Sequence, residues 1–177
     1  PVSATTSSII YAEAHMSPDS SEHWLVKPES SYHRIIFYRF DLGADIGTGK
    51  TITSATFKVY HTASYSPSGT IPVDECSAFS GSSTTYAARP TQETTLGSFS
   101  ETVRNAYATV TDTGGTMTQR FQAMYDIDGH IYLELDASGH SPSDSDTWFD
   151  GAGYSGGVYA SDSVKTYITV EYTSAPT

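Results

Sequence analysis

Apolar and polar residues alternate along several short segments, and this alternation predicts β-strands. The clearest case is residues 51–61, TITSATFKVYH, where Ala55, Phe57 and Val59 share one face and polar residues stand between them. Residues 34–42, RIIFYRFDL, form the most apolar segment of the chain. Both segments are predicted strands that bury at least one face against a core.

Similar patterns predict a mainly β protein. Further strands are expected at residues 8–14, 23–27, 71–79, 99–110, 129–136 and 164–172. Only residues 116–125 have helical spacing, with Met117, Phe121 and Met124 at i, i+4 and i+7. The intervening segments, such as 43–50, 80–92 and the Gly-, Ser- and Asp-rich stretch 138–159, are predicted loops.

The number and spacing of these strands predict the fold class. About eight to ten strands without a βαβ rhythm indicate an all-β jelly-roll β-sandwich with at most one short helix. A chain of 177 residues is long enough for one such domain, expected at residues 1–172, with a tail at 173–177.

Composition and charge exclude several classes of protein. The net charge is −11, with 9 basic and 20 acidic residues and no basic cluster, so nucleic-acid binding is not expected. No run of 18 apolar residues occurs, so membrane insertion is not expected either. Cys76 is the only cysteine and has no partner for an intrachain disulfide.

The N-terminal sequence leaves two alternatives. Pro1 fits a complete intracellular product from which the initiator Met was removed, or the first residue of a fragment of a larger secreted protein. Because no signal peptide is visible and the single cysteine is free, the first is the expectation.

Three blocks of the chain resemble the DNRLRE, or disaggregatase-related, domain family. Residues 34–42 are similar to its RxLLRFDL block, and residues 52–60, ITSATFKVY, are similar to the strand that follows. Residues 84–90, TTYAARP, resemble its TTWxxRP loop, with Tyr86 in place of Trp. The resemblance implies a non-catalytic jelly roll that serves as a module of surface proteins, some carbohydrate-binding, or of phage structural proteins.

Loop aromatics and acidic residues are the candidate binding chemistry. A sugar ring lies on Trp or Tyr through its apolar face, and the candidates near loops are Trp24, Tyr32, Tyr86, Trp148 and Tyr154. Spaced carboxylates in Gly-rich segments suit a structural Ca²⁺ ion, and the candidates are Asp126, Asp128, Asp144, Asp146 and Asp150. Each set also has an ordinary structural interpretation, as core anchors and as turn-forming residues.

The sequence does not single out catalytic residues. The chain has no HxH or HExxH motif, and its six histidines are expected to be scattered over the surface, although a zinc site assembled from distant residues stays open. Carboxylates for glycoside cleavage exist, Glu13 and Glu134 among them, but the sequence does not single out a pair. Arg39 and Asp41 share one strand face and are expected to pair with a neighbouring strand or loop.

These observations predict a protein that acts by binding or by assembly and not as an enzyme. The favoured hypothesis is a structural or decorating protein of a phage virion, on the virion surface, with a capsid protein, a tail protein or further copies of itself as partner. The alternative is a carbohydrate-binding or adhesion module of a larger extracellular or cell-surface protein, with a polysaccharide as partner.

Overall fold

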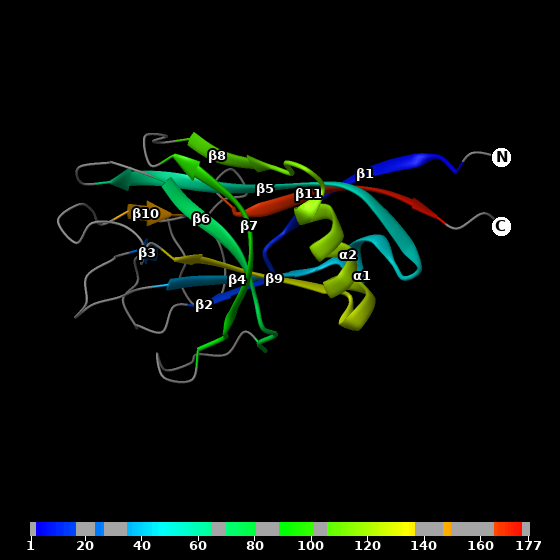
Figure 1. Cartoon of the computed structure of the whole chain (residues 1–177), viewed down its shortest axis with the longest axis horizontal. Coiled ribbons are helices and arrows are strands. Elements are labelled where there is room, and N and C mark those ends of the chain that lie inside the picture. The colour runs from blue at the N-terminus through cyan, green and yellow to red at the C-terminus, as the bar shows by residue number, and fades with distance from the viewer. Residues whose placement is uncertain are drawn as a thin grey trace.

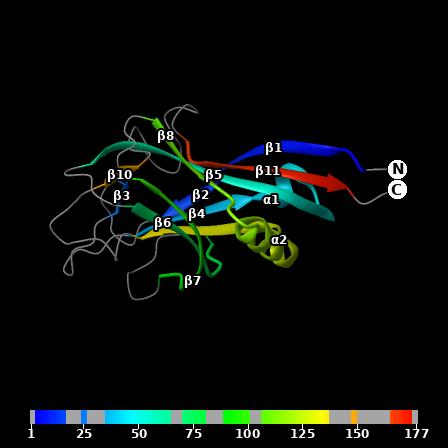
Figure 2. The same cartoon turned by 45° about the horizontal axis from the view of Figure 1, so that its top comes forward.

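Two antiparallel β-sheets pack face to face in the computed structural model of the chain (Figure 1). The structure describes residues 3–16, 24–26, 35–64, 70–80, 89–100, 106–136, 147–149 and 165–174. Figure 2 shows the sheet that contains β1, β5 and β11 above the one that contains β4 and β9.

The first sheet, sheet A, contains both the first and the last strand of the chain. Its strands are β1 (Thr5–Tyr11), β11 (Tyr167–Ser174), β5 (Lys50–Ser64), β8 (Ala106–Thr111), β10 (Thr147–Phe149) and β3 (Trp24–Val26). β1 lies at one edge and pairs with β11, which pairs with β5, and β5 pairs in turn with β8 and β10.

The second sheet, sheet B, contains the most apolar strand of the chain. Its strands, in spatial order, are β2 (Ala14–Met16), β4 (Ile35–Asp41), β9 (His130–Asp136), β6 (Thr70–Cys76) and β7 (Gln92–Ser100). Each sheet thus has four strands of six residues or more, besides three-residue strands.

The order of these eight longer strands is that of a jelly roll. Counted along the chain, sheet A has the order first, eighth, third, sixth, and sheet B has the order second, seventh, fourth, fifth. The chain therefore crosses repeatedly between the sheets and closes with its last long strand beside its first, as in a jelly roll. The predicted all-β jelly-roll sandwich is confirmed.

The core lies between the sheets and follows the alternation in the sequence. Phe57 and Val59 of β5 face Tyr38 and Phe40 of β4, and all four side chains are fully buried. Ring centroids of Tyr38 and Phe57 are 6.2 Å apart across the interface.

The alternate residues of each strand form the two outer faces. The outer face of sheet B is partly covered, because Ile35 and Phe37 on it are buried and Phe79 packs against Phe37.

Two helices, where at most one was predicted, lie toward the end of the sandwich at which β1 begins and β11 ends (Figure 1). Residues 42–46, expected to be loop, form α1 (Leu42–Ile46) because the Asp41 carboxylate caps it, accepting from the Ala44 amide at 2.9 Å, and because Leu42 and Ile46 are buried. The predicted helix is α2 (Thr116–Asp128), which is longer than expected.

Several strand boundaries differ from the prediction, and the first strand is Thr5–Tyr11 instead of residues 8–14. Residues 99–110 are not one strand: β7 ends in sheet B and β8 begins in sheet A, so the chain changes sheets between them. β6 stops at Cys76 instead of residue 79, although the Ser77 amide still donates to the Thr91 carbonyl at 2.9 Å. β11 extends through Ser174, two residues into the predicted tail.

Neither described helix is long and apolar enough to cross a membrane.

Candidate binding surface

Four tyrosines lie on the outer face of sheet A, one from each of its longer strands. Tyr11 of β1 stands directly opposite Tyr167 of β11, and Tyr60 of β5 stands opposite Tyr107 of β8. Their sequence neighbours, such as Ile168, point into the core, so strand alternation directs the tyrosines outward. We call Tyr11, Tyr167, Tyr107 and Tyr60 the tyrosine row.

The rings of the tyrosine row contact one another in sequence across the sheet. Ring centroids are 5.8 Å apart for Tyr11 and Tyr167, 5.1 Å for Tyr167 and Tyr107, and 5.4 Å for Tyr107 and Tyr60. Each pair is edge-to-face, the arrangement that aromatic quadrupoles favour. The rings therefore hold one another in place and form a continuous aromatic strip.

Two of the four lysines of this acidic chain lie over the same strip. The ammonium group of Lys165 is 5.3 Å from the Tyr11 ring centroid, and that of Lys58 is 5.9 Å from the Tyr167 centroid. The Tyr107 hydroxyl donates to the Lys165 carbonyl at 2.8 Å. The outer face of sheet A thus combines aromatic rings with local positive charge on a protein of net charge −11.

The strip is open to solvent at its β1 edge. Tyr11 is 40% exposed, and Ile9, two residues earlier on the same face of β1, is 55% exposed. Tyr167, Tyr107 and Tyr60 are partly exposed. Large side chains held outward on a regular sheet, and not buried by the fold, are suited to contact a partner.

The outer face of sheet B differs in shape and charge, because it contains a polar cavity of about 450 Å³. The cavity is lined by Ile35, Arg89, Pro90, Thr91, Gln92, Glu134 and Asp136. Asp74 lies opposite Glu134 in the β6–β9 ladder, and its Oδ2 accepts from Gln92 at 2.7 Å. Within the described part of the chain, Asp74 Oδ1 has no hydrogen-bond partner.

Burial and mutual repulsion control the protonation of these carboxyl groups. Burial raises the pKa of Glu134 to about 8, with further contributions from the charges of Asp136 and Asp74 and an opposing one from Arg89. Burial also raises the pKa of Asp74, although hydrogen bonds from Thr95 and Gln92 oppose that shift. The cavity therefore holds a carboxyl group that is protonated at neutral pH.

The structure describes two of the five residues that were predicted to contact a sugar. Trp24 is in β3 and Trp148 in β10, adjacent strands of sheet A, with Trp24 opposite Phe149 and Trp148 opposite Leu25. The other three candidates, Tyr32, Tyr86 and Tyr154, lie outside the described residues.

The sequence-predicted calcium residues also divide into two groups. Asp126 and Asp128 are on the last turn of α2. Asp126 accepts from the Gln122 side chain at 2.8 Å, and Asp128 accepts from the His130 amide at 2.9 Å and the Tyr132 hydroxyl at 2.7 Å. The others, Asp144, Asp146 and Asp150, lie outside the described residues.

The tyrosine row was missed by the sequence analysis, which searched for exposed aromatics in loops. The usable signal was that Tyr60 takes a polar-face position in the strand pattern of residues 51–61, one residue after the core residue Val59. Tyr167 likewise alternates with Ile168. The grouping of the four rings depends on which strands are neighbours, and the sequence pattern does not contain that information.

No protein-family model and no curated protein matches this chain, so its function must be inferred from its own residues.

Proposed function

We propose that this protein is a non-catalytic carbohydrate-binding or adhesion module, and that it holds a polysaccharide against the outer face of sheet A. The observation that carries the proposal is the tyrosine row, a continuous strip of four rings across four strands. A location outside the cell or on a cell surface follows, because extended polysaccharides are found there.

The chemistry of the strip suits a sugar chain. The C–H faces of a pyranose ring pack on Tyr rings, and the Tyr hydroxyls can exchange hydrogen bonds with sugar hydroxyls. Threonines flank the row on the same face: Thr56 neighbours Lys58, and Thr109 lies opposite Lys58 in the ladder. Lysine is depleted at the cores of protein interfaces, so Lys58 and Lys165 over the rings favour a hydrated ligand over a dry protein contact.

The test is affinity electrophoresis in gels that contain individual polysaccharides. We expect retardation by at least one of them, and at least a tenfold loss of affinity in Tyr167→Ala, because Tyr167 contacts two other rings of the row. Tyr167→Phe should bind nearly normally, since it keeps the ring. Ile127→Ala, at an 83% exposed position on α2, is the matched surface control.

Failure of the wild-type protein to bind any polysaccharide, or equal binding by Tyr167→Ala, would contradict this role. Release of reducing ends from a bound polysaccharide would contradict the proposal that the module is non-catalytic.

A second candidate is a structural or decorating protein of an assembly, such as the surface of a phage virion. The observation that favours it is the edge strand β1, which has a partner on only one side in the described sheet and exposes Ile9 and Tyr11. Such an edge can pair with a strand of a capsid or tail protein or of a second copy of this chain.

Light-scattering mass distinguishes this second role. A stable oligomer at micromolar concentration that dissociates in Ile9→Lys, with no polysaccharide binding, would replace the first proposal by the second. A monomer that binds polysaccharide would exclude self-assembly through β1.

The DNRLRE resemblance is compatible with both roles, and we propose that the chain is a divergent member of that group. Two of the three blocks that carry the resemblance coincide with β4, which lies between β2 and β9 in sheet B, and β5, the central strand of sheet A.

A further inference from the structure

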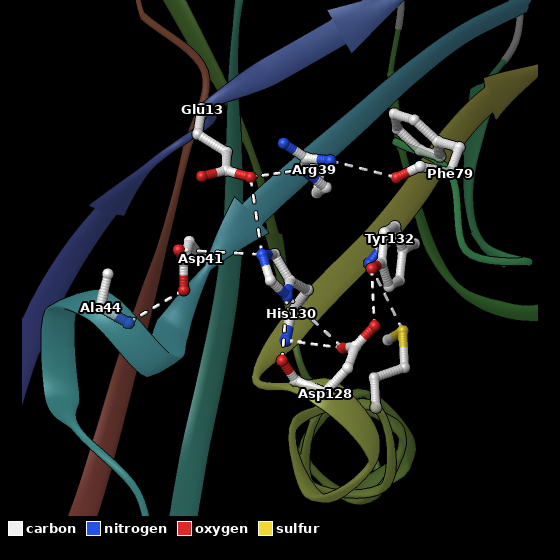
Figure 3. A network of polar contacts seen from close by, with 9 residues as sticks. Glu13, Arg39, Asp41, Ala44, Phe79, Asp128, His130 and Tyr132 are labelled. Atoms are coloured by element: carbon white, nitrogen blue, oxygen red, sulfur yellow. Dashed lines mark hydrogen bonds and ion pairs between the residues drawn. The ribbon is translucent and has the colours of Figure 1, made fainter. Parts of the chain in front are cut away.

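Three metal-ligating side chains from separate parts of the chain meet at one end of sheet B (Figure 3). Asp41, the last residue of β4, lies opposite His130, the first residue of β9. Glu13, which lies between β1 and β2, is brought beside them by a 2.9 Å hydrogen bond from its amide to the Arg39 carbonyl. The fold therefore assembles Glu13, Asp41 and His130 from three strand ends.

The distances within this group are longer than hydrogen bonds and are compatible with ligands around one ion. His130 Nε2 is 3.6 Å from Glu13 Oε1 and 3.7 Å from Asp41 Oδ2, and the three ligand atoms lie within 4.8 Å of one another. A hydrogen bond to nitrogen requires about 2.7–3.2 Å. Ligands at about 2.0–2.1 Å from a tetrahedral Zn²⁺ are separated by about 3.3 Å, so small side-chain shifts suffice.

The other ring nitrogen of His130 determines what Nε2 presents to the carboxylates. His130 Nδ1 is 3.0 Å from the Asp128 carbonyl oxygen, which accepts hydrogen bonds but cannot donate one. Nδ1 therefore carries a proton, and in the neutral ring Nε2 directs a lone pair toward Glu13 and Asp41. Nε2 and the two carboxylates are then acceptors that face one another, and a cation between them would accept electron pairs from all three.

Each carboxylate is also held by a second group, as metal ligands commonly are. The Arg39 guanidinium pairs with Glu13. The Ala44 amide donates to Asp41 Oδ1 at 2.9 Å and so directs Oδ2 toward His130 (Figure 3). Together with the Asp128 carbonyl on His130, all three side chains have a partner that fixes their orientation.

We propose that Glu13, Asp41 and His130 bind a divalent metal ion of the zinc type through His130 Nε2 and one carboxylate oxygen each from Glu13 and Asp41. An imidazole ligand favours Zn²⁺ over Ca²⁺ or Mg²⁺, which prefer oxygen. Two carboxylates and the Arg39 guanidinium leave a net charge of −1 for the ion to offset. The side chains are 25–32% exposed, so a fourth position is open to water or to a ligand.

Titration of the purified full chain with Zn²⁺, followed by calorimetry at pH 7, is the test, with Co²⁺ as the spectroscopic probe. We expect one Zn²⁺ per chain, a visible Co²⁺ absorption typical of tetrahedral coordination, and a shift of the His130 ring resonances in NMR. His130→Gln and Glu13→Gln should each weaken Zn²⁺ binding at least about 10- to 100-fold, because loss of a group that merely supports a ligand already costs that much. The matched control is Glu171→Gln, an exposed carboxylate on β11 of sheet A, which should bind Zn²⁺ as the wild type does.

Thermal unfolding of the metal-free variants checks that each is folded. If His130→Gln does not fold, Glu13→Gln, whose side chain is 32% exposed, provides the same comparison. Three results would each overturn the proposal. The first is wild-type affinity for Zn²⁺ in both variants, and the second is movement of other histidine resonances but not those of His130. The third is no Zn²⁺ binding by the wild type at millimolar concentration. The last result would leave the approach of His130 Nε2 to Glu13 and Asp41 as a contact between side chains alone.

Discussion

Glu134 shows how a single buried carboxyl group makes the stability of this protein depend on pH. It is 2% exposed, lines the cavity on sheet B, and stands beside Asp74 and Asp136, both also buried. Because its pKa rises to about 8 on folding, the folded protein keeps a proton that the unfolded chain releases above its ordinary pKa of 4.5.

This linkage predicts that the free energy of unfolding falls as the pH rises from about 5 to 9. Glu134 contributes stability in full below pH 4.5 and loses it as the pH rises through 8, by at most about 1.4 kcal/mol per pH unit. Glu134→Gln keeps the shape of the side chain but cannot titrate, so the free energy of unfolding of this variant should vary less with pH. Urea unfolding at pH 5, 7 and 9 measures both slopes, and equal slopes would refute the assignment.

At the scale of elements, a contact between two glycines holds α1 against the C-terminal end of α2. Gly43 in α1 and Gly129 after α2 meet closely, with the Gly43 amide donating to the Gly129 carbonyl at 2.9 Å. Gly129 has a φ of +81°, which ends α2 in the left-handed region, and a Cβ there would lie 3.4 Å from Gly43 Cα. The backbone conformation therefore favours glycine, and an added Cβ would lie at the short end of van der Waals contact with Gly43.

Gly129→Ala is expected to destabilise the protein by more than the cost of φ alone. The left-handed conformation costs an L-residue about 1–2 kcal/mol, and the contact with Gly43 adds to it. Gly114→Ala is the matched control, because Gly114 has a φ of +79° with no atom within 4 Å of its added Cβ. Chemical denaturation of both variants separates strain from contact, and equal losses would show that the contact is unimportant.

Element prediction from the sequence succeeded where alternation was strong and failed where one residue decided the outcome. The core positions of β5, such as Phe57 and Val59, follow from period two alone. α1 was missed because the glycines around it indicated a loop, although Asp41 followed by Leu42 and Ile46 at i, i+4 is a capped helical turn. The contact between Glu13 and His130 follows from strand order, which local pattern does not encode.

At the scale of the whole molecule, the first and last strands close the sandwich together. β1 is an edge strand, yet Ile10 is fully buried against the core, while its neighbour Ile9 faces outward. The first strand of the chain therefore contributes a buried side chain to the hydrophobic core.

Ile10→Ala should therefore destabilise the protein by about 2–5 kcal/mol, the usual cost of removing a buried Ile side chain. Ile9→Ala, one residue away on the exposed face, should change stability by about 0.5 kcal/mol or less. Denaturant midpoints of the two variants test this difference. A small loss in Ile10→Ala would mean that β1 separates from the sandwich before the rest unfolds.

The pairing of β1 with β11 also determines how the fold responds to mechanical force. Thr5 lies opposite Thr173, so the two ends of the paired strands lie side by side at one pole of the sandwich. Tension applied between those ends acts along the hydrogen bonds of the β1–β11 ladder and opens them one at a time, like a zipper. The fold would yield there at low force if it were pulled from both ends. A different loading is possible if the molecule is held by one chain end and pulled through the tyrosine row. Tyr11 and Tyr167 lie at the other ends of β1 and β11 from Thr5 and Thr173, so the force is then shared by several strands at once.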